Sequence, residues 1–418
     1  MQAVHGTSVS EWSAPPMMPV SGSDGLTVAR VPPERWQRLE DWDAVLTGSA
    51  RPSVFLTRDW VTSWWAAFGH GAEPWLLRVA GPTGEPLGLA PLYLDRAPGT
   101  ARLPIRRLGI MGDHSVGSEY LGLIARAGHE QAVGQAVADH LAAEGVRWDL
   151  ADLSGLVEGD PAASALEAPL RTRAGRSRAQ RHACSAVALP DSFETYLAGV
   201  GSKFRQSYRQ RASKLHRTCT VRYLLTASEA DLRPHLEAMF RMHQAHWTAL
   251  GLPGSFGDRR MRRFYLDVSR RLLASGRLRF WQLEVDGVIR ASQFGFAYAG
   301  VLHSLQEGYD TGLRAPGIGG FGVVLRAHAI KAAIEEGLRG YDFLGGTEDF
   351  KRRWGTSVHH VRNVHLAAPG PRGSLAWMAT VGAHDARSRL RRRAPDGLVK
   401  TIRALRTRRY GRRPPGGA

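Results

Sequence analysis

The chain has 418 residues, of which 43% are hydrophobic and 12 are tryptophan, and this composition excludes an intrinsically disordered protein. Its length exceeds the roughly 250–300 residues at which a single hydrophobic core stops growing, so we expect two domains. No segment approaches the ~20 apolar residues of a membrane span. The two cysteines, Cys184 and Cys219, form no CxxC pair, which argues against a disulfide framework or a structural metal site and favours the cytoplasm.

The net charge of +18 is concentrated near the C-terminus. Between Asp385 and Ala418 there are twelve Lys and Arg against two acids, a surplus of ten. Such a tail is either a solvated basic terminus or a surface that touches tRNA or an anionic membrane. The charge by itself therefore leaves the partner open.

The first elements in chain order indicate an α+β domain. Residues 1–24 have neither a basic n-region nor an apolar h-region, so we expect a disordered leader rather than a signal peptide. Aromatic residues recur at helical spacing in Arg58–Gly69, with Thr57 as the N-cap and Gly69 as the terminator. Two strand-like segments, a helix near 129–144 and the strand RWDLADL follow, and we place this first domain at 25–154.

The next stretch, 155–182, has little periodicity and is the best boundary between domains, with part of it in a peripheral helix and strand. A second domain then spans 183–368, and a basic tail spans 369–418. Asp286-Gly287 and Ala299-Gly300 are turn signals that predict three antiparallel strands in succession. A glycine-rich loop, a helix and the strand YDFL follow these strands.

The glycine-rich loop Arg314–Gly320 is the first candidate binding site. A diphosphate needs several backbone N–H groups aimed at one point, and glycines before a helix N-terminus supply that geometry. The alternative is a plain left-handed turn between strand and helix. The predicted cofactor-binding residues are Arg314, Pro316, Gly317, Ile318, Gly319 and Gly320.

A second motif, YDFLGGTEDFKRRWGT, makes the chain resemble a known family. It is similar to the D-F-x-x-G-x-E-x-[YF]-K-x-x-[WF] signature of the GNAT-superfamily acetyltransferase branch found with bacterial cellulose-synthesis clusters. That branch is related to the FemAB-like transferases. LPDSFETYL before an Arg-rich helix, the Trp-rich helix and SEYLGL also resemble this branch, so the resemblance covers about residues 50–368.

The resemblance implies tandem GNAT-like domains, an α+β fold with mixed, mostly antiparallel sheets flanked by helices. It also implies an N-acyltransferase that moves an acyl group from acetyl-CoA or another acyl-CoA to a primary amine of a small molecule or a saccharide precursor. No metal is expected. An aminoacyl-tRNA donor remains an alternative, as does a non-catalytic protein of envelope or polysaccharide assembly.

Direct attack of an amine on a thioester needs a proton acceptor and a donor to the developing oxyanion. Glu307, at the end of the third strand, and Glu348, after the YDFL strand, are the candidate bases, and each could equally be an ordinary ion-paired acid. Lys351 completes the predicted catalytic set. Asp342 lies in an apolar strand and needs a partner, such as Lys351 or Arg352, so its role is either structural or substrate-binding.

The helix at 203–217 has an apolar stripe of Phe204, Tyr208, Ala212 and Leu215. Arg205 and Arg209 lie along the edge of this stripe, where they could bind a phosphate or a carboxylate, or simply make the helix soluble. In the later helix RMHQAHWTALG, the histidines lack a third metal ligand. We therefore expect His243, with Trp247, to line the substrate site, the alternative being a histidine satisfied within the fold.

Overall fold

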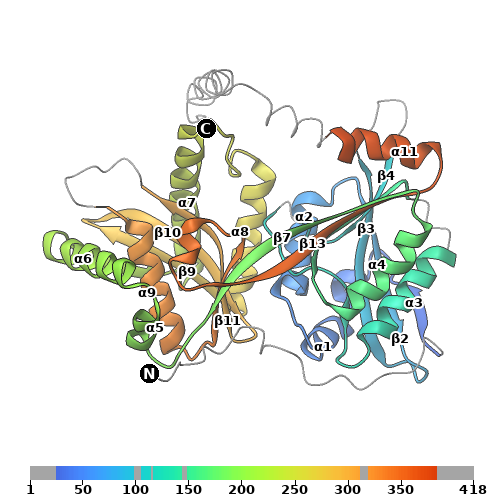
Figure 1. Ribbon diagram of the computed structural model, residues 1–418, viewed down its shortest axis with the longest axis horizontal. Coiled ribbons are helices and arrows are strands. Elements are labelled where there is room, and N and C mark those ends of the chain that lie inside the picture. The colour runs from blue at the N-terminus through green and yellow to red at the C-terminus, as the bar shows by residue number, and fades with distance from the viewer. Residues whose placement is uncertain (1–24, 98–104, 114–115, 144–147, 311–318, 384–418) are drawn as a thin grey trace. The chain divides into compact units, whose positions relative to one another are not determined.

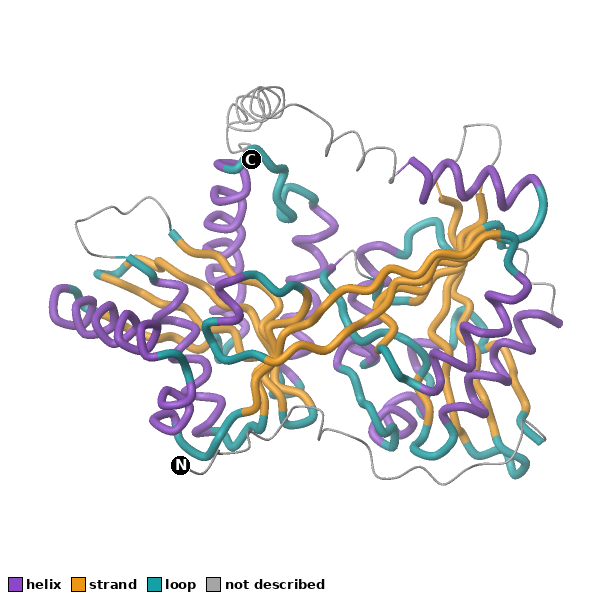
Figure 2. Tube along the Cα trace, viewed as in Figure 1, coloured by secondary structure: helices purple, strands orange, loops and turns teal. Residues whose placement is uncertain are grey.

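The computed structural model describes residues 25–97, 105–113, 116–143, 148–310 and 319–383 (Figures 1 and 2). The expected α+β fold of mixed, mostly antiparallel sheet flanked by helices is confirmed. Its described residues form two compact units. Unit 1 runs to Ala183 and resumes at His359, and unit 2 is Cys184–Val358.

Unit 1 is built on a sheet with the strand order β1-β2-β3-β4-β6-β13-β7, and β5 pairs with β3. Helix α3 packs on α4 and on strands β1–β3. Strands β7 and β13 each contribute residues to both units. The bounds are β1 Thr27–Arg30, α1 Asp41–Thr47, α2 Arg58–Phe68, β2 Glu73–Ala80, β3 Pro86–Ala97, β4 Ile105–Ile110, β5 Ile124–Ala125, α3 Glu130–Ala143, β6 Leu150–Val157, α4 Pro161–Arg173, β7 Arg176–Ala188, β13 Ser357–Ala367 and α11 Pro371–Trp377.

The Trp-rich helix of unit 1 is confirmed as α2. The side chain of Thr57 accepts a hydrogen bond from the N–H of Trp60, and Gly69 is the C-cap. The stretch expected as a boundary, 155–182, holds the end of β6, helix α4 and the first half of β7. The expected tail begins with α11, and its residues after 383 lie outside the described residues. The expected domain bounds remain a prediction about which parts fold independently.

Unit 2 has the strand order β7-β12-β11-β10-β9-β8. The three antiparallel strands expected from the turn signals are β9, β10 and β11. Asp286, Gly287, Ala299 and Gly300 all have positive φ, as type I′ hairpins require. The bounds are α5 Phe193–Gly199, α6 Ser202–Thr218, β8 Val221–Leu225, α7 Glu229–Ala249, α8 Arg259–Ala274, β9 Leu278–Val285, β10 Val288–Tyr298, β11 Val301–Tyr309, α9 Phe321–Glu335, β12 Gly340–Gly345 and α10 Asp349–Arg352.

Helices cover both faces of the unit 2 sheet. Side chains of a strand alternate between its faces, and on β10 Ala291 joins a cluster with α9, whereas Phe294 packs on Tyr265 of α8. Helix α7 lies along β10 and β11, while α5 and α6 pack on α9. The stripe predicted on α6 faces this core, where Leu215 is buried and Phe204 and Tyr208 pack against the buried cluster of α5 and α9.

Two features of this sheet position the site. Strands β11 and β12 are parallel, but they pair only from Val301–His303 to Gly340–Asp342 and diverge beyond those residues. The register between β10 and β11 also shifts after Ser304, so β11 has a bulge at this point. None of the described helices combines enough length with enough apolar content to cross a membrane.

Candidate functional site

The N-terminus of helix α9 lies beside the place where β11 ends. Gly320 is the N-cap residue, with φ of 77°, and a Cβ on Gly322 would lie 3.4 Å from the Tyr309 ring of β11. The first amides of a helix have no intrahelical carbonyl to bond, and Gly320 has no side chain to cap them. With no acidic residue in the first turn, this helix end presents N–H groups and partial positive charge to an anion.

An arginine from α6 adds to this positive charge. A Cβ on Gly320 would lie 2.5 Å from Nη1 of Arg211, so the guanidinium lies directly against the helix N-terminus. Of the predicted loop residues, Gly319 and Gly320 are described, and Gly319 is exposed. Arg314, Pro316, Gly317 and Ile318 lie outside the described residues.

Glu307, one of the two candidate bases, is held by a buried arginine. Nε of Arg326 on α9 donates to its Oε1 at 3.0 Å, and Nη2 donates to Oε2. The Arg326 side chain is 6% exposed and that of Glu307 is 20% exposed. Burial works to lower the pKa of Arg326, but the charge and hydrogen bond of Glu307, together with Tyr341 and Tyr309, outweigh it and raise that pKa above its ordinary value.

On β12, Asp342 is buried at the last residue that pairs with β11. Its Oδ1 accepts the N–H of Leu344 at 2.7 Å, and its Oδ2 lies 3.5 Å from Nδ1 of His303 on β11. The ring of His303 stacks on Phe296. His303 thus lies beside this carboxylate, while Arg352, one of the two expected partners, bonds Asp349.

Lys351 is also buried, and its ammonium group donates to main-chain oxygens. The acceptors are the carbonyls of Phe343, Leu344, Gly345 and Gly346. Glu348, the other candidate base, lies 3.2 Å from the same Nζ, and its own side chain is 57% exposed. The ammonium group is thus engaged by the end of β12 rather than free in a cavity.

His243 and Trp247 lie one turn apart on α7 and bond each other. Nε1 of Trp247 donates to Nε2 of His243 at 2.7 Å, which leaves the imidazole proton on Nδ1. Gln306 of β11 contacts the same Nε2 at 3.1 Å. Burial, with a smaller contribution from His246, lowers the pKa of His243 to about 4, so the ring is neutral at pH 7.

The two arginines predicted along the edge of α6 differ in environment. Nη1 of Arg205 donates to the carbonyls of Leu197 and Ala198, so this side chain closes the C-terminal end of α5. Arg209 is exposed. Neither lies among the contacts of Glu307, Asp342 or Lys351 described above.

Three residues of this region were missed by sequence reasoning: Arg211, His303 and Arg326. A signal existed for Arg326, because a single arginine interrupts the apolar run VVLRAHAI, and a buried charge needs a partner. Arg211 and His303 carry no comparable local signal, since their importance depends on which element packs beside them.

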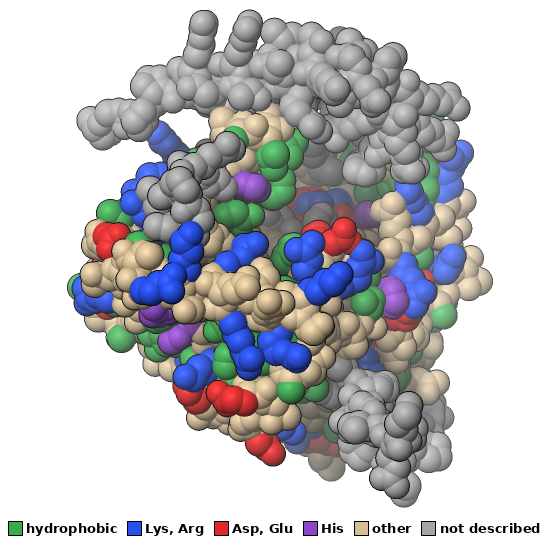
Figure 3. Space-filling model, turned by 60° about the vertical axis from the view of Figure 1, so that its left-hand side comes forward, with side chains coloured by type: hydrophobic (Ala, Val, Ile, Leu, Met, Phe, Trp, Pro, Cys, Tyr) green, Lys and Arg blue, Asp and Glu red, His purple; other side chains and the backbone are tan. Residues whose placement is uncertain are grey.

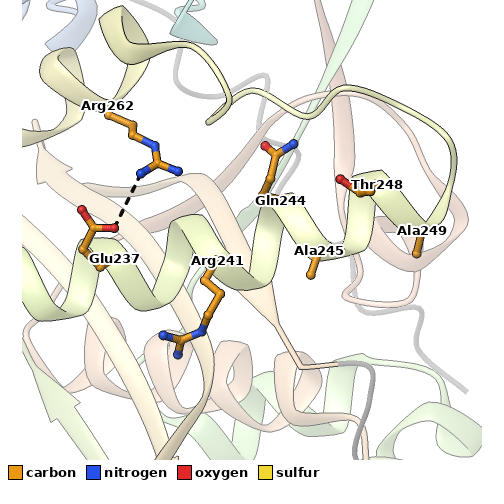
Figure 4. Close-up of a pocket in the computed structure, with 7 residues that line it drawn as sticks. All are labelled: Glu237, Arg241, Gln244, Ala245, Thr248, Ala249 and Arg262. Atoms are coloured by element: carbon orange, nitrogen blue, oxygen red, sulfur yellow. Dashed lines mark ion pairs between the residues drawn. The ribbon is translucent and has the colours of Figure 1, made fainter. Parts of the chain in front are cut away.

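A separate pocket of about 600 Å³ lies on the outer side of α7 (Figure 4). Glu237 and Arg241 of α7 line it with Arg262 of α8, and Glu237 and Arg262 form an ion pair at 3.7 Å. These residues are on the side of α7 that faces away from His243 and β11. The pocket is therefore distinct from the divergence of β11 and β12.

One family model matches part of the second unit. Residues 202–352 match the family described as Acetyltransferase (GNAT) domain. This range runs from α6 to α10 and contains the α9 N-terminus, Glu307, Asp342 and Lys351. This match covers about a third of the chain, and it supports a GNAT-type domain over those residues. No curated protein sequence matches the chain closely enough to count as a relative.

Solved structures share the fold at low sequence identity. The structure of FemX has a TM-score of 0.57 and 12% identity, and the match covers 85% of this chain and 99% of that one. Two weaker likenesses are to L-PGS from Bacillus licheniformis (TM-score 0.47, 12% identity, 81% and 95% coverage) and to a tandem GNAT protein from the clavulanic acid biosynthesis pathway (0.45, 14%, 83% and 100%). The FemX match supports the expected fold across both units.

Proposed function

We propose that the chain is an N-acyltransferase that moves an acyl group from acyl-CoA to a primary amine of a small molecule or a saccharide precursor. The observation that carries this proposal is the divergence of β11 and β12 beside the N-terminus of α9. Two parallel strands that stay paired bury their backbone groups in each other. Strands that diverge leave those groups available to an extended, amide-containing arm.

The donor's phosphates are proposed to bind at the start of α9. The first-turn amides and the guanidinium of Arg211 supply hydrogen-bond donors and positive charge at one point. The loop residues Arg314, Pro316, Gly317 and Ile318 remain proposed contributors. The acyl end of the donor would then lie toward Glu307, on the diverging part of β11, and toward Asp342, the last residue of β12 that pairs with β11.

In the reaction, the amine nitrogen attacks the thioester carbonyl, and the resulting tetrahedral intermediate expels the CoA thiolate. The attacking nitrogen must lose a proton on the way, and a carboxylate near the divergence is the proposed acceptor. Glu307 and Glu348 are the candidates, and both make an ion pair in the structure. Asp342, His243 and Trp247 are proposed to line the acceptor side.

Calorimetry tests donor binding, with acetyl-CoA, longer acyl-CoAs and free CoA as probes. We expect binding to full-length protein, at least ten-fold weaker binding to Arg211→Gln, and wild-type binding to Arg217→Gln, which removes the same charge elsewhere on α6. Absence of binding by any CoA species to folded wild-type protein would falsify the acyl-CoA donor.

The acceptor is found by incubating the protein and labelled acetyl-CoA with a cell extract and identifying the labelled product by mass spectrometry. With that acceptor in hand, Glu307→Gln and Glu348→Gln distinguish the two candidate bases. The variant that lacks the base should lose kcat at least 100-fold without weaker donor binding. Full activity in both variants would exclude both carboxylates.

An aminoacyl-tRNA donor is the second candidate, favoured by the charge of α6. This helix has six Lys and Arg and no acid, and Figure 3 shows Lys and Arg side chains spread over the side of the molecule that includes it. A tRNA donor predicts tRNA binding that falls steeply with salt and weakens when 385–418 is removed. Salt-independent or absent tRNA binding, alongside acyl-CoA binding, would exclude it.

A further inference from the structure

The end of β12 makes a sharp turn at the point where it leaves β11. Leu344 has a φ of 57° and Gly346 a φ of 101°. Glycine adopts such values readily, but a leucine in the left-handed region is unfavourable and persists only where its surroundings enforce it. The contacts around Leu344 therefore need to supply that enforcement.

Lys351 stabilises the turn at Leu344 through its carbonyl oxygens. Its Nζ lies 3.1 Å from the carbonyl oxygen of Phe343, 3.4 Å from that of Leu344 and 3.5 Å from that of Gly346, and it also bonds Gly345. Four carbonyl oxygens that converge on one point repel each other unless a cation lies between them. Because Lys351 is only 6% exposed, water cannot readily replace the ammonium group.

Asp342 stabilises the same turn through its N–H. Its carboxylate accepts the N–H of Leu344, the same residue whose carbonyl bonds Lys351. The second carboxylate oxygen lies 3.5 Å from His303 on β11. A buried cation thus holds the carbonyls of the turn, while a buried anion holds its N–H and lies close to His303 of the neighbouring strand.

We propose that Lys351 and Asp342 are positioning residues that fix where β12 turns away from β11 and so keep the donor site open. This inference rests on the proposed function, because it assigns these residues to the site where the acyl arm would bind. It gives Lys351 a role different from direct catalysis: its ammonium group acts through the backbone of 343–346.

Two variants of the chain, Lys351→Met and Asp342→Asn, test this positioning role. Lys331→Met is the matched control. Lys331 pairs with Glu335 on α9, but its side chain is 50% exposed. We expect Lys351→Met to weaken acetyl-CoA binding and raise the donor KM at least ten-fold, with the acceptor KM unchanged. Lys331→Met should bind acetyl-CoA like wild type.

A second measurement does not depend on activity. Amide hydrogen exchange of a peptide covering 341–350 should become at least ten-fold faster in Lys351→Met and in Asp342→Asn, and should stay at the wild-type rate in Lys331→Met. The effects of the two variants should be less than additive in the double variant, because both act on one turn. In Lys351→Ala, millimolar ethylammonium should restore slow exchange and donor binding.

The outcomes separate this inference from the proposed function. Wild-type exchange at 341–350 in Lys351→Met would overturn the positioning role whatever the donor is. Wild-type donor affinity in a folded Lys351→Met protein would overturn its link to the donor site and leave the acyltransferase proposal standing. Faster exchange in the variants, together with no binding of any CoA species by wild type, would support the role of both residues in the turn. The same result would refute acyl-CoA as the donor.

Discussion

Arg326 is a buried cation among the apolar residues of α9, and Glu307 is its counterion. Burying a guanidinium is costly unless its donors are bonded. The carboxylate of Glu307 therefore has a structural role in addition to its proposed role as a base. Lys351 and Asp342 are buried charged groups as well, and each is held by several contacts. In this region, charged residues are structural and candidate functional residues at once, and variants need a stability readout beside an activity readout.

Glu307→Gln should lower the free energy of unfolding of unit 2 by about 2–4 kcal/mol, since it leaves the Arg326 charge buried without a counterion. The lower part of the range for such pairs applies because Glu307 is one-fifth exposed. Urea denaturation is the measurement. Asp349→Asn, which breaks the exposed pair with Arg352, should change stability by less than about 0.5 kcal/mol; equal effects would contradict the buried pair.

His243 should make stability depend on pH. Burial lowers its pKa to about 4 in the folded protein, against about 6.5 in the unfolded chain. Between these values the unfolded state binds more protons, so stability is full above about pH 6.5 and falls as the pH drops toward 4, by at most about 1.4 kcal/mol per unit. Urea unfolding at pH 7, 5.5 and 4.5 should show a shallower fall in stability in His243→Gln than in wild type.

At the scale of elements, helices α7 and α9 of unit 2 differ in how their N-termini are capped. Helix α7 begins with a capping box, in which the side chain of Ser228 accepts the N–H of Asp231 and the Asp231 carboxylate accepts the N–H of Ser228. Helix α9 begins instead at a glycine with no cap. The contrast agrees with an N-terminus that serves stability in α7 and one left open to a ligand in α9.

Ser228→Ala should therefore lower the stability of unit 2 by about 1 kcal/mol through the loss of the cap. Thermal unfolding followed by circular dichroism measures it. Ser202→Ala is the control, because α6 has Gly201 at its N-cap and no side-chain cap bond there. If both serine variants lost the same stability, the capping box would not be what stabilises the start of α7.

At the scale of the whole molecule, the two units do not follow one another along the chain. Unit 1 is completed by residues that come after unit 2, since β13 lies between β6 and β7 in its sheet. Val361, Val364 and Leu366 of β13 are buried. Unit 1 therefore cannot close its core until the segment from His359 on is present.

A chain that ends at Val358 should lose the cooperative unfolding of unit 1, whereas a chain that ends at Ala383 should keep it. The shorter chain exposes the edge of β6 and removes the buried residues of β13. Amide exchange of a peptide from β3 is the readout, with a peptide from β10 reporting on unit 2 in the same sample. Native protection of β3 in the chain that ends at Val358 would show that unit 1 folds without β13.

The sequence by itself determined the features that depend on neighbouring residues. Thr57 and Gly69 delimit α2, and the dipeptides after β9 and β10 set their hairpins, because capping and positive φ are local properties. Apolar spacing likewise predicted the buried face of α6. The GNAT-like signature also agrees with the family model that matches residues 202–352.

Only the tertiary structure decided which groups meet. Glu307 is paired with Arg326, which is 19 residues away on another element, and Lys351 bonds carbonyls whose convergence depends on the turn at Leu344. The return of β13 to unit 1 carries no local signal either. Pairing across elements depends on strand order and on the cost of leaving a buried charge alone, and neither can be read from spacing along the chain.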